Sequence, residues 1–307
     1  MAKFGPPREA VVRTEVIDQC LVCGGSALEV VDADNALKGC QTCGFVFDSP
    51  RPTVEALIDF YSKPGQYDDW LDAEAARDRL WRARVLKMMP TRRAGSLLDI
   101  GTGIGQFLDH AKPFFNPVYG TEVSSSAIEI ARARYGLELY QGQLDDLVFD
   151  RKFDNITMFH VLEHVPHPAD LVGRCVELLE PGGKLYIAVP NELKSILKTV
   201  KRSLGRLGVK RYAAMSPLNI QKICLDGSMG EIHLSHFDDD SLRLLLQRAG
   251  LVVVESGLDP YSVATGRRGI IDRSLLKIGE SVMRLTGNNI YDAIWMVAVK
   301  PEVFQSN

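Results

Sequence analysis

Residues 97–105, Leu-Leu-Asp-Ile-Gly-Thr-Gly-Ile-Gly, decide the fold of this chain of 307 residues. The first four form an apolar run around one acid, which is typical of a buried β-strand, and Gly101 marks its end. Residues 106–111 (QFLDHA) then have helical spacing, so the glycines form a turn between a strand and a helix. Such a turn exposes backbone N–H groups and lets a ligand approach where a Cβ would collide. The stretch predicts a ligand-binding loop, with a tight turn that binds nothing as the alternative.

Strand and helix patterns alternate from residue 96 onward, which predicts an α/β fold with a parallel sheet and helices on both faces. The expected strands are 96–100, 118–122, 137–141, 153–159, 184–189, 251–255 and 294–299. Helices are expected at 53–61, 72–89, 124–135, 168–179, 238–249 and 273–285. In a sheet of this kind a ligand binds outside the carboxyl ends of the strands.

Glu122 ends the second expected strand, where its carboxylate can accept hydrogen bonds from two ribose hydroxyls. A dinucleotide-binding loop has the pattern G-x-G-x-x-G. Here the glycines follow G-x-G-x-G, and Gln106 stands at the third position of the dinucleotide pattern. The loop therefore suits a ligand without a pyrophosphate.

Four of the six cysteines are patterned as two pairs, Cys20-x2-Cys23 and Cys40-x2-Cys43. Two such knuckles predict a tetrahedral zinc site, and four cysteines leave no position open for water, so the zinc is expected to be structural. Two disulfides are the alternative, which a reducing cytoplasm disfavours. Cys175 and Cys224 stand apart from the pattern, and we interpret them as free thiols.

The composition is that of an ordinary globular protein, with 46% hydrophobic residues and a net charge of −3. That charge gives no general attraction to nucleic acid, so we expect no DNA partner. No apolar run approaches the ~20 residues that span a bilayer, and the N-terminus lacks the apolar core of a signal peptide. We expect a cytoplasmic protein without stable membrane insertion.

Five stretches of residues 96–190 resemble, in order, the motifs of the class I S-adenosylmethionine-dependent methyltransferases, especially their quinone- and sugar-modifying branch. They are LLDIGTGIGQFL, YGTEVS, GQLDDL, FDNITMFHVLEHVPHPADLV and LLEPGGKLYIAVPN. The resemblance implies a Rossmann-like, doubly wound, mostly parallel sheet of seven strands, with S-adenosylmethionine as the methyl donor. It implies contacts to the donor from Asp99, Gly101 and Gly103 (methionine part), Glu122 (ribose), Gln143 and Leu144 (adenine), and Phe159 and His160 (sulfonium). Thr102 and Val123 are expected to contact the donor as well.

The four-cysteine segment resembles the head of the deoxysugar C-methyltransferases. We expect a zinc ribbon over residues 1–50, a helical linker or lid over 51–93, and a methyltransferase domain over 94–307. Two insertions interrupt that domain, at about 193–232 and 266–289. The first begins with a basic amphipathic segment, 193–212, which includes Lys194, Lys198, Lys201 and Arg202. We favour a lid that clamps an anionic acceptor over a membrane contact. The second insertion packs beside the first or forms a subunit contact in a homodimer.

Three histidines are candidate catalytic residues, because methyl transfer often needs a base and histidine titrates near neutral pH. His160 and His164 follow the strand at 153–159, and His233 belongs to the stretch EIHLSHF. The pattern His160-x-x-Glu163-His164 also resembles the Glu-x-x-Glu-His motif that, with a distant histidine, holds a divalent metal in some RNA-terminal and quinone O-methyltransferases. The alternative, which we favour from the sequence, is that Glu163 and His164 only open the next helix.

The sequence therefore predicts a methyltransferase that modifies an oxygen or carbon of a small saccharide, polyketide or quinone-like acceptor. Two alternatives stay open. One is an RNA methyltransferase that uses the zinc ribbon to bind nucleic acid. The other is a non-catalytic protein that binds S-adenosylmethionine.

Overall fold

The computed structural model describes residues 13–63, 68–89, 95–196, 199–200, 203–204, 207, 218, 220–225, 229–260, 263–264 and 266–302. Of the basic residues predicted to clamp the acceptor, Lys198, Lys201 and Arg202 lie outside these ranges. The ammonium of Lys194 pairs with Asp238 (2.9 Å) and Asp240, which lie at the start of the helix α8 (Asp239–Arg248).

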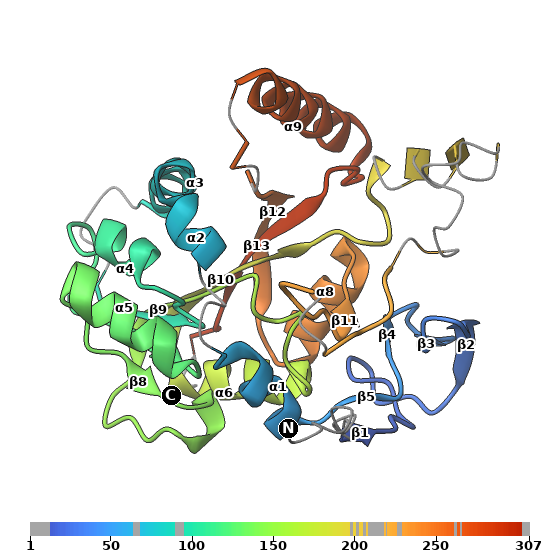
Figure 1. Cartoon of the computed structure of the whole chain (residues 1–307), viewed down its shortest axis with the longest axis horizontal. Coiled ribbons are helices and arrows are strands. Elements are labelled where there is room, and N and C mark those ends of the chain that lie inside the picture. Colours follow the sequence, from blue (N-terminus) through green and yellow to red (C-terminus); the bar gives the residue numbers. More distant parts are fainter. Residues whose placement is uncertain are drawn as a thin grey trace, which may run out of the picture.

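A seven-stranded sheet forms the centre of the molecule (Figure 1). Its order is β12 (Val252–Leu258), β13 (Ala293–Val299), β10 (Leu179–Pro190), β9 (Phe153–Phe159), β6 (Leu97–Ile100), β7 (Val118–Glu122) and β8 (Tyr140–Gln141). All neighbours are parallel except β13, which runs antiparallel to both β10 and β12. The predicted fold class, a doubly wound and mostly parallel sheet, is confirmed.

Helices cover both faces of the sheet. Successive residues of a strand point to opposite faces, so neighbouring residues of a central strand lie in two different cores. Leu97 packs in a core with α3 (Glu74–Met88), α4 (Gln106–Ala111) and α5 (Ser125–Tyr135). The next residue, Leu98, packs in a second core with α6 (Pro168–Leu178) and α8 (Asp239–Arg248). The strand of the glycine loop is thus buried on both sides, which fixes the loop at its carboxyl end.

The N-terminal cysteine segment forms a small antiparallel sheet of β2 (Leu28–Asp32), β3 (Leu37–Cys40) and β4 (Val46–Asp48). Its fourth strand, β11 (Ser235–His236), comes from the other end of the chain and pairs with β4. Phe45 packs against Phe237 with 5.0 Å between the ring centroids. The ribbon therefore shares a sheet with β11 and a core with the helices that cover the central sheet.

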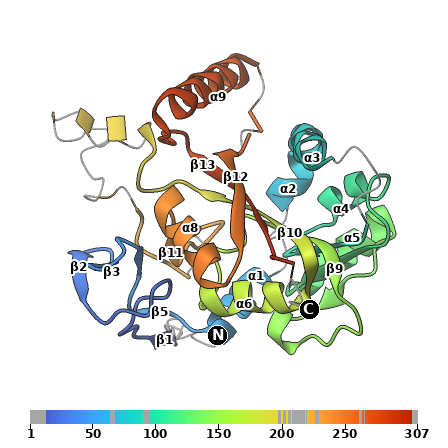
Figure 2. The same ribbon diagram turned by 180° about the vertical axis from the view of Figure 1, so that it is seen from behind.

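The remaining elements border the carboxyl ends of the central strands or the edges of the sheets. β1 (Thr14–Glu15) pairs with β5 (Arg51–Pro52), and α1 (Val54–Tyr61) and α2 (Asp68–Asp72) lead to α3. A 3₁₀ turn covers Leu144–Asp146. The long helix α9 (Gly266–Thr286) lies beyond the edge strand β12 (Figure 2). Among the described residues, no helix is long and apolar enough to cross a membrane.

Candidate active site

A cavity of about 710 Å³ opens at the carboxyl ends of β6, β7 and β9. Helices α1, α3 and α9 contribute its other walls. Most of the predicted donor-binding residues line it: Gly101, Gly103, Glu122, Val123, Gln143, Leu144, Phe159 and His160. The glycine loop, the acid at the end of β7 and the loop before the 3₁₀ turn therefore meet in one place.

Glu122 is buried at the base of the glycine loop. One carboxylate oxygen accepts a hydrogen bond from the Gly103 backbone N–H (2.7 Å), and the other accepts from the Val123 (2.8 Å) and Ser124 (2.9 Å) backbones. Burial raises the pKa of Glu122, while the three backbone N–H groups oppose that shift. Gly103 has φ of +58°, and a Cβ there would lie 2.8 Å from Trp70. The loop thus requires glycine at this position.

Asp99 and Thr102 do not line the cavity, although both are expected from the sequence to contact the donor. The Asp99 carboxylate accepts a hydrogen bond from the Thr157 hydroxyl (2.6 Å), and the Thr102 hydroxyl donates to the Asp99 carbonyl (3.0 Å). Burial raises the pKa of Asp99 to about 7, against the effect of both hydroxyls. In this structure the two residues brace the turn, and their contact with the donor stays a prediction.

His160 lies at the end of β9 with φ of +55°, a conformation that residues other than glycine seldom adopt. Its backbone N–H donates to the Ala188 carbonyl (2.8 Å), which holds the residue against β10. The ring lies between two buried carboxylates, with Nε2 at 3.3 Å from Asp259 and Nδ1 at 3.3 Å from Glu163. Burial alone lowers the pKa of His160, but the two carboxylates outweigh it and the pKa is raised. The two carboxylates thus favour the protonated form of His160.

Asp259 connects His160 to Arg84, which is fully buried on α3. The guanidinium donates to both Asp259 oxygens, from Nε (3.0 Å) and from Nη2. The Cζ atom of the Arg84 guanidinium lies 4.9 Å from the centroid of the Phe159 ring. Nη1 of Arg84 is buried at the cavity without a hydrogen-bond acceptor among the described residues.

Glu163, His164 and His233, hereafter the Glu163 cluster, each place one potential ligand atom within 4.8 Å of the others. The Nδ1 of His164 lies 2.6 Å from the Ile232 carbonyl oxygen, which can only accept, so Nδ1 carries the proton. The Nε2 of His164 then faces Glu163, at 3.8 Å from Oε1. The Nδ1 of His233 lies 3.2 Å from the Glu192 carboxylate, and its Nε2 lies 3.8 Å from Oε2 of Glu231.

The two histidines of the Glu163 cluster have pKa values shifted in opposite directions. Burial lowers the pKa of His164, so this ring is neutral near pH 7. Burial would lower the pKa of His233 too, but Glu192 and Glu231 raise it to about 10. Glu163 is itself buried, yet the neighbouring histidines lower its pKa, and neither of its oxygens has a well-aligned hydrogen-bond donor among the described residues. His164 lines the cavity, whereas Glu163 and His233 lie behind its wall.

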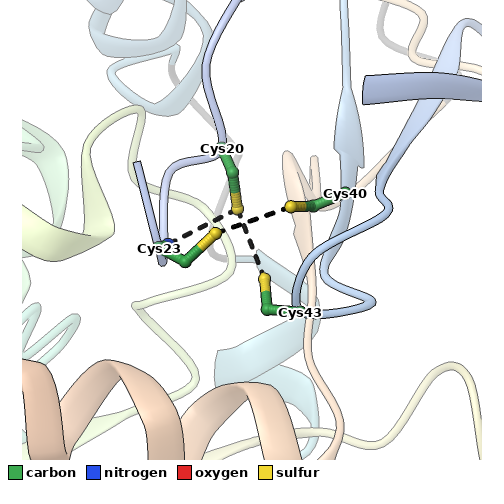
Figure 3. Close-up of side chains that lie close together, drawn as sticks. All are labelled: Cys20, Cys23, Cys40 and Cys43. Atoms are coloured by element: carbon green, nitrogen blue, oxygen red, sulfur yellow. Dashed lines mark hydrogen bonds between the residues drawn. The ribbon is translucent and has the colours of Figure 1, made fainter. Parts of the chain in front are cut away.

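The four predicted cysteine ligands converge in the ribbon (Figure 3). The Sγ atoms of Cys20 and Cys43 lie 3.5 Å apart, as do those of Cys23 and Cys40. All four cysteines are free in this structure, and these separations are longer than the about 2.05 Å between the sulfurs of a disulfide. They are close to the ~3.8 Å between sulfurs of a tetrahedral site with Zn–S bonds of about 2.3 Å. The four residues fit a structural zinc ion, as the spacing predicts.

Arg84, Asp259 and Glu192 were not among the residues predicted from the sequence. A signal for Arg84 was present, since it stands three residues after Trp81 and four before Met88 and therefore on the buried face of α3. Asp259 directly follows β12 and Glu192 stands two residues after β10, but nothing local distinguishes them from other polar residues at strand ends.

Comparison with known proteins gives a family. A methyltransferase-domain model matches residues 73–256. Two curated relatives are a ubiquinone biosynthesis O-methyltransferase of Nitrosococcus oceani and the O-methyltransferase cnsE of Penicillium expansum. The first is 32% identical over 40% of this chain and 57% of its own length, and the second 26% identical over 47% and 56%. The chain thus spans little more than half of these relatives.

Two solved structures share the fold. Magnesium protoporphyrin IX methyltransferase from Synechocystis with bound SAH gives a TM-score of 0.52 at 13% identity, over 81% of this chain and all of that one. A Haloferax volcanii putative methyltransferase, solved with the Trm112 methyltransferase activator, gives 0.50 at 20% identity, over 77% of this chain and 96% of the matched chain. The fold, the cavity beside the glycine loop and the family match lead to one conclusion: the chain belongs to the class I S-adenosylmethionine-dependent methyltransferases.

Proposed function

We propose that this chain transfers a methyl group from S-adenosylmethionine to a hydroxyl oxygen of a small acceptor, activated beside the Glu163 cluster. The observation that carries the proposal is the convergence of Glu163, His164 and His233 at the wall of the donor cavity. The names of the two curated relatives, both O-methyltransferases, support oxygen over carbon as the methylated atom.

The donor would bind along the glycine loop. Gly101 and Gly103 leave room for its methionine part, and Glu122 faces the cavity where the ribose is expected. Bound S-adenosylmethionine supplies the methyl group for direct displacement by the acceptor. The protein's main task is then to hold the two reactants in line and close together.

The Glu163 cluster fits a divalent metal ion. Both histidines direct Nδ1 to an oxygen of the protein, Ile232 in one case and Glu192 in the other, which is how metal-ligating histidines are usually oriented. Glu163 adds a buried carboxylate that lacks well-aligned hydrogen bonds. A divalent cation held there would displace the proton that His233 otherwise carries at neutral pH, and it would lower the pKa of an acceptor hydroxyl. This geometry favours the metal interpretation over the simple helix-opening role that the sequence suggested.

A second mechanism uses His164 without a metal. Its lowered pKa keeps the ring neutral, its Nδ1–H is fixed on the Ile232 carbonyl, and the residue lines the cavity. His164 therefore suits the general base that takes the proton from the acceptor. His233 suits that role less well, because a histidine with a pKa of about 10 is already protonated at neutral pH.

The acceptor is further proposed to be anionic. The buried Nη1 of Arg84 has no acceptor among the described residues, and Arg268 of α9 also lines the cavity. A carboxylate or phosphate in the cavity would satisfy Arg84 with a charge-assisted hydrogen bond. Dihydroxybenzoates and nucleotide sugars are therefore suitable test acceptors.

The test measures release of S-adenosylhomocysteine by mass spectrometry over dihydroxybenzoates, nucleotide sugars and total RNA. Protein stripped with a chelator is assayed before and after titration with Mg²⁺ or Mn²⁺. We expect turnover of a small acceptor that returns only with the metal. Undiminished turnover after stripping would reject the metal and leave His164 as the base. Turnover of RNA alone would favour the nucleic-acid alternative, and release from no acceptor would favour a non-catalytic binder.

Two variants sharpen this test. Glu163→Gln keeps the shape of the side chain and removes its charge, so we expect it to abolish metal-dependent turnover while the affinity for S-adenosylmethionine stays within about twofold. Glu180→Gln is the matched control, because Glu180 is exposed at the start of β10 and away from the cavity. Equal activity of the two variants would contradict a role for Glu163.

A further inference from the structure

A continuous line of buried polar contacts joins the cysteine ribbon to the Glu163 cluster. Asp48 ends β4 of the ribbon and is 2% exposed. Its carboxylate lies 2.9 Å from Nε2 of His236 in β11. Nδ1 of His236 donates to one oxygen of Glu192, and the other oxygen of Glu192 lies 3.2 Å from Nδ1 of His233. We call Asp48, His236, Glu192 and His233 the ribbon network.

His236 holds this network together as a cation between two carboxylates. The ring is 1% exposed, and burial alone would lower its pKa. Glu192 and Asp48 outweigh burial and raise the pKa of His236 to about 9. Both ring nitrogens therefore carry protons at neutral pH, and each donates to a different carboxylate. Glu192 is thereby held in one orientation, with its second oxygen turned to His233.

The backbone fixes the first contact of the ribbon network. β11 pairs with β4 in antiparallel register, with His236 opposite Val46 and Ser235 opposite Phe47. Asp48 and His236 thus stand on adjacent strands. Sheet pairing by itself would need no polar side chains here. Burying Asp48 and His236, with Glu192 and His233 partly buried beside them, is costly unless these groups pair with each other.

We propose that Asp48 and His236 are positioning residues that orient His233 of the Glu163 cluster through Glu192, so that the ribbon forms part of the support of the acceptor site. This inference rests on the proposed role of His233 in holding the metal beside the acceptor. It assigns the ribbon a task in the acceptor half of the reaction, because the network ends at the Glu163 cluster, beside which the acceptor is proposed to be activated.

The test uses the full-length, zinc-loaded protein and the variant Asp48→Asn. Asn keeps the size of the side chain but removes the charge that faces His236. Partners that orient metal ligands typically change metal affinity or activity by about 10- to 100-fold. We therefore expect Mn²⁺ binding, followed by electron paramagnetic resonance, to weaken by about that factor. The kcat/KM for the acceptor should fall similarly, with the Kd for S-adenosylmethionine and the zinc content unchanged.

A direct probe is the Nδ1–H proton of His233 in protein labelled with ¹⁵N-histidine. In the wild type, its hydrogen bond to Glu192 should give a downfield, slowly exchanging signal, and Asp48→Asn should shift or broaden it. Asp34→Asn is the matched control, since Asp34 is an exposed acid of the same ribbon outside the network. Asp48→Glu, which restores the charge, should recover part of the acceptor kcat/KM.

Each contrary result is distinguishable. Wild-type Mn²⁺ affinity and an unchanged His233 signal in Asp48→Asn would overturn the inference. A uniform loss of donor affinity, zinc and acceptor turnover would also overturn it, because that pattern indicates a merely structural role. If Asp48→Asn does not fold, the absence of the downfield His233 signal in the wild type overturns it instead. A wild type that binds no Mn²⁺ refutes the proposed metal, and the His233 signal still decides the positioning role.

Discussion

The buried pair of Arg84 and Asp259 offers a quantitative test of the site's architecture. Both side chains are at most 1% exposed, and both oxygens of Asp259 accept from the guanidinium. Burial would raise the pKa of Asp259, yet Arg84 and His160 hold it far below the ordinary value. Asp259→Asn keeps the shape and removes the charge, which leaves Arg84 buried without its counter-ion. Breaking such a pair from one side costs about 3–5 kcal/mol.

The expected loss converts into a shift of the melting temperature. An unfolding entropy of about 2.1 cal/mol/K per residue gives about 0.6 kcal/mol/K for a chain of 307 residues. Asp259→Asn should therefore lower Tm by about 5–8 °C in differential scanning calorimetry. The double variant Arg84→Met/Asp259→Leu removes both charges and should recover most of that loss. A drop of less than about 1.5 °C, or a double variant no better than the single one, would refute the reasoning.

Three further outcomes follow from the site. Gly103→Ala places a Cβ 2.8 Å from Trp70 at φ of +58° and should weaken S-adenosylmethionine binding by at least tenfold in calorimetry. Gly173→Ala is the control and should leave this binding unchanged, because Gly173 lies on α6 away from the cavity and a Cβ there meets no atom within 4 Å. Cys40→Ser should lower the zinc content measured by elemental analysis, and an unchanged content would exclude the four-cysteine site. The raised pKa of His236 means that the folded protein binds its proton more tightly than the unfolded chain does. This contribution to stability is full below pH 6.5, amounts to about 3 kcal/mol and is lost as the pH rises through about 9. Urea midpoints of wild type and His236→Gln should therefore converge at high pH, and parallel curves would contradict the assignment.

Local patterns were sufficient for most of the central sheet. The strands predicted at 118–122 and 153–159 match β7 and β9 residue for residue, because both segments are rich in aromatic and β-branched residues, which favour strands. The strand expected at 137–141 contracts to Tyr140–Gln141. Its first residue is still part of the helix end, since the Leu137 N–H donates to the Ala131 carbonyl around the left-handed Gly136. β3 was not predicted, because Lys38 and Gly39 have little preference for strands.

Some residues of the candidate site could likewise be predicted from local motifs, and others could not. Residues near the glycine loop and after β9 were predicted because their motifs are contiguous in the sequence. The partners that set their chemistry come from distant segments: Arg84 and Asp259 are separated by 175 residues, and Asp48 and His236 by 188. No local period or composition encodes such pairs, because they arise only when the sheet is assembled. The pKa difference between His164 and His233 also depends on that assembly, since it is Glu192 and Glu231 that raise the pKa of His233.

The pairing of β11 with β4 has a consequence for synthesis on the ribosome. β4 leaves the ribosome early, but its partner strand follows only after the 188 residues that separate Asp48 from His236. At ~5–20 residues per second, this interval is roughly 10–40 s. During that time the outer edge of the ribbon sheet presents unpaired backbone groups, which can recruit a strand from another nascent chain. The ribbon's own strands are therefore made well before the strand that completes their sheet.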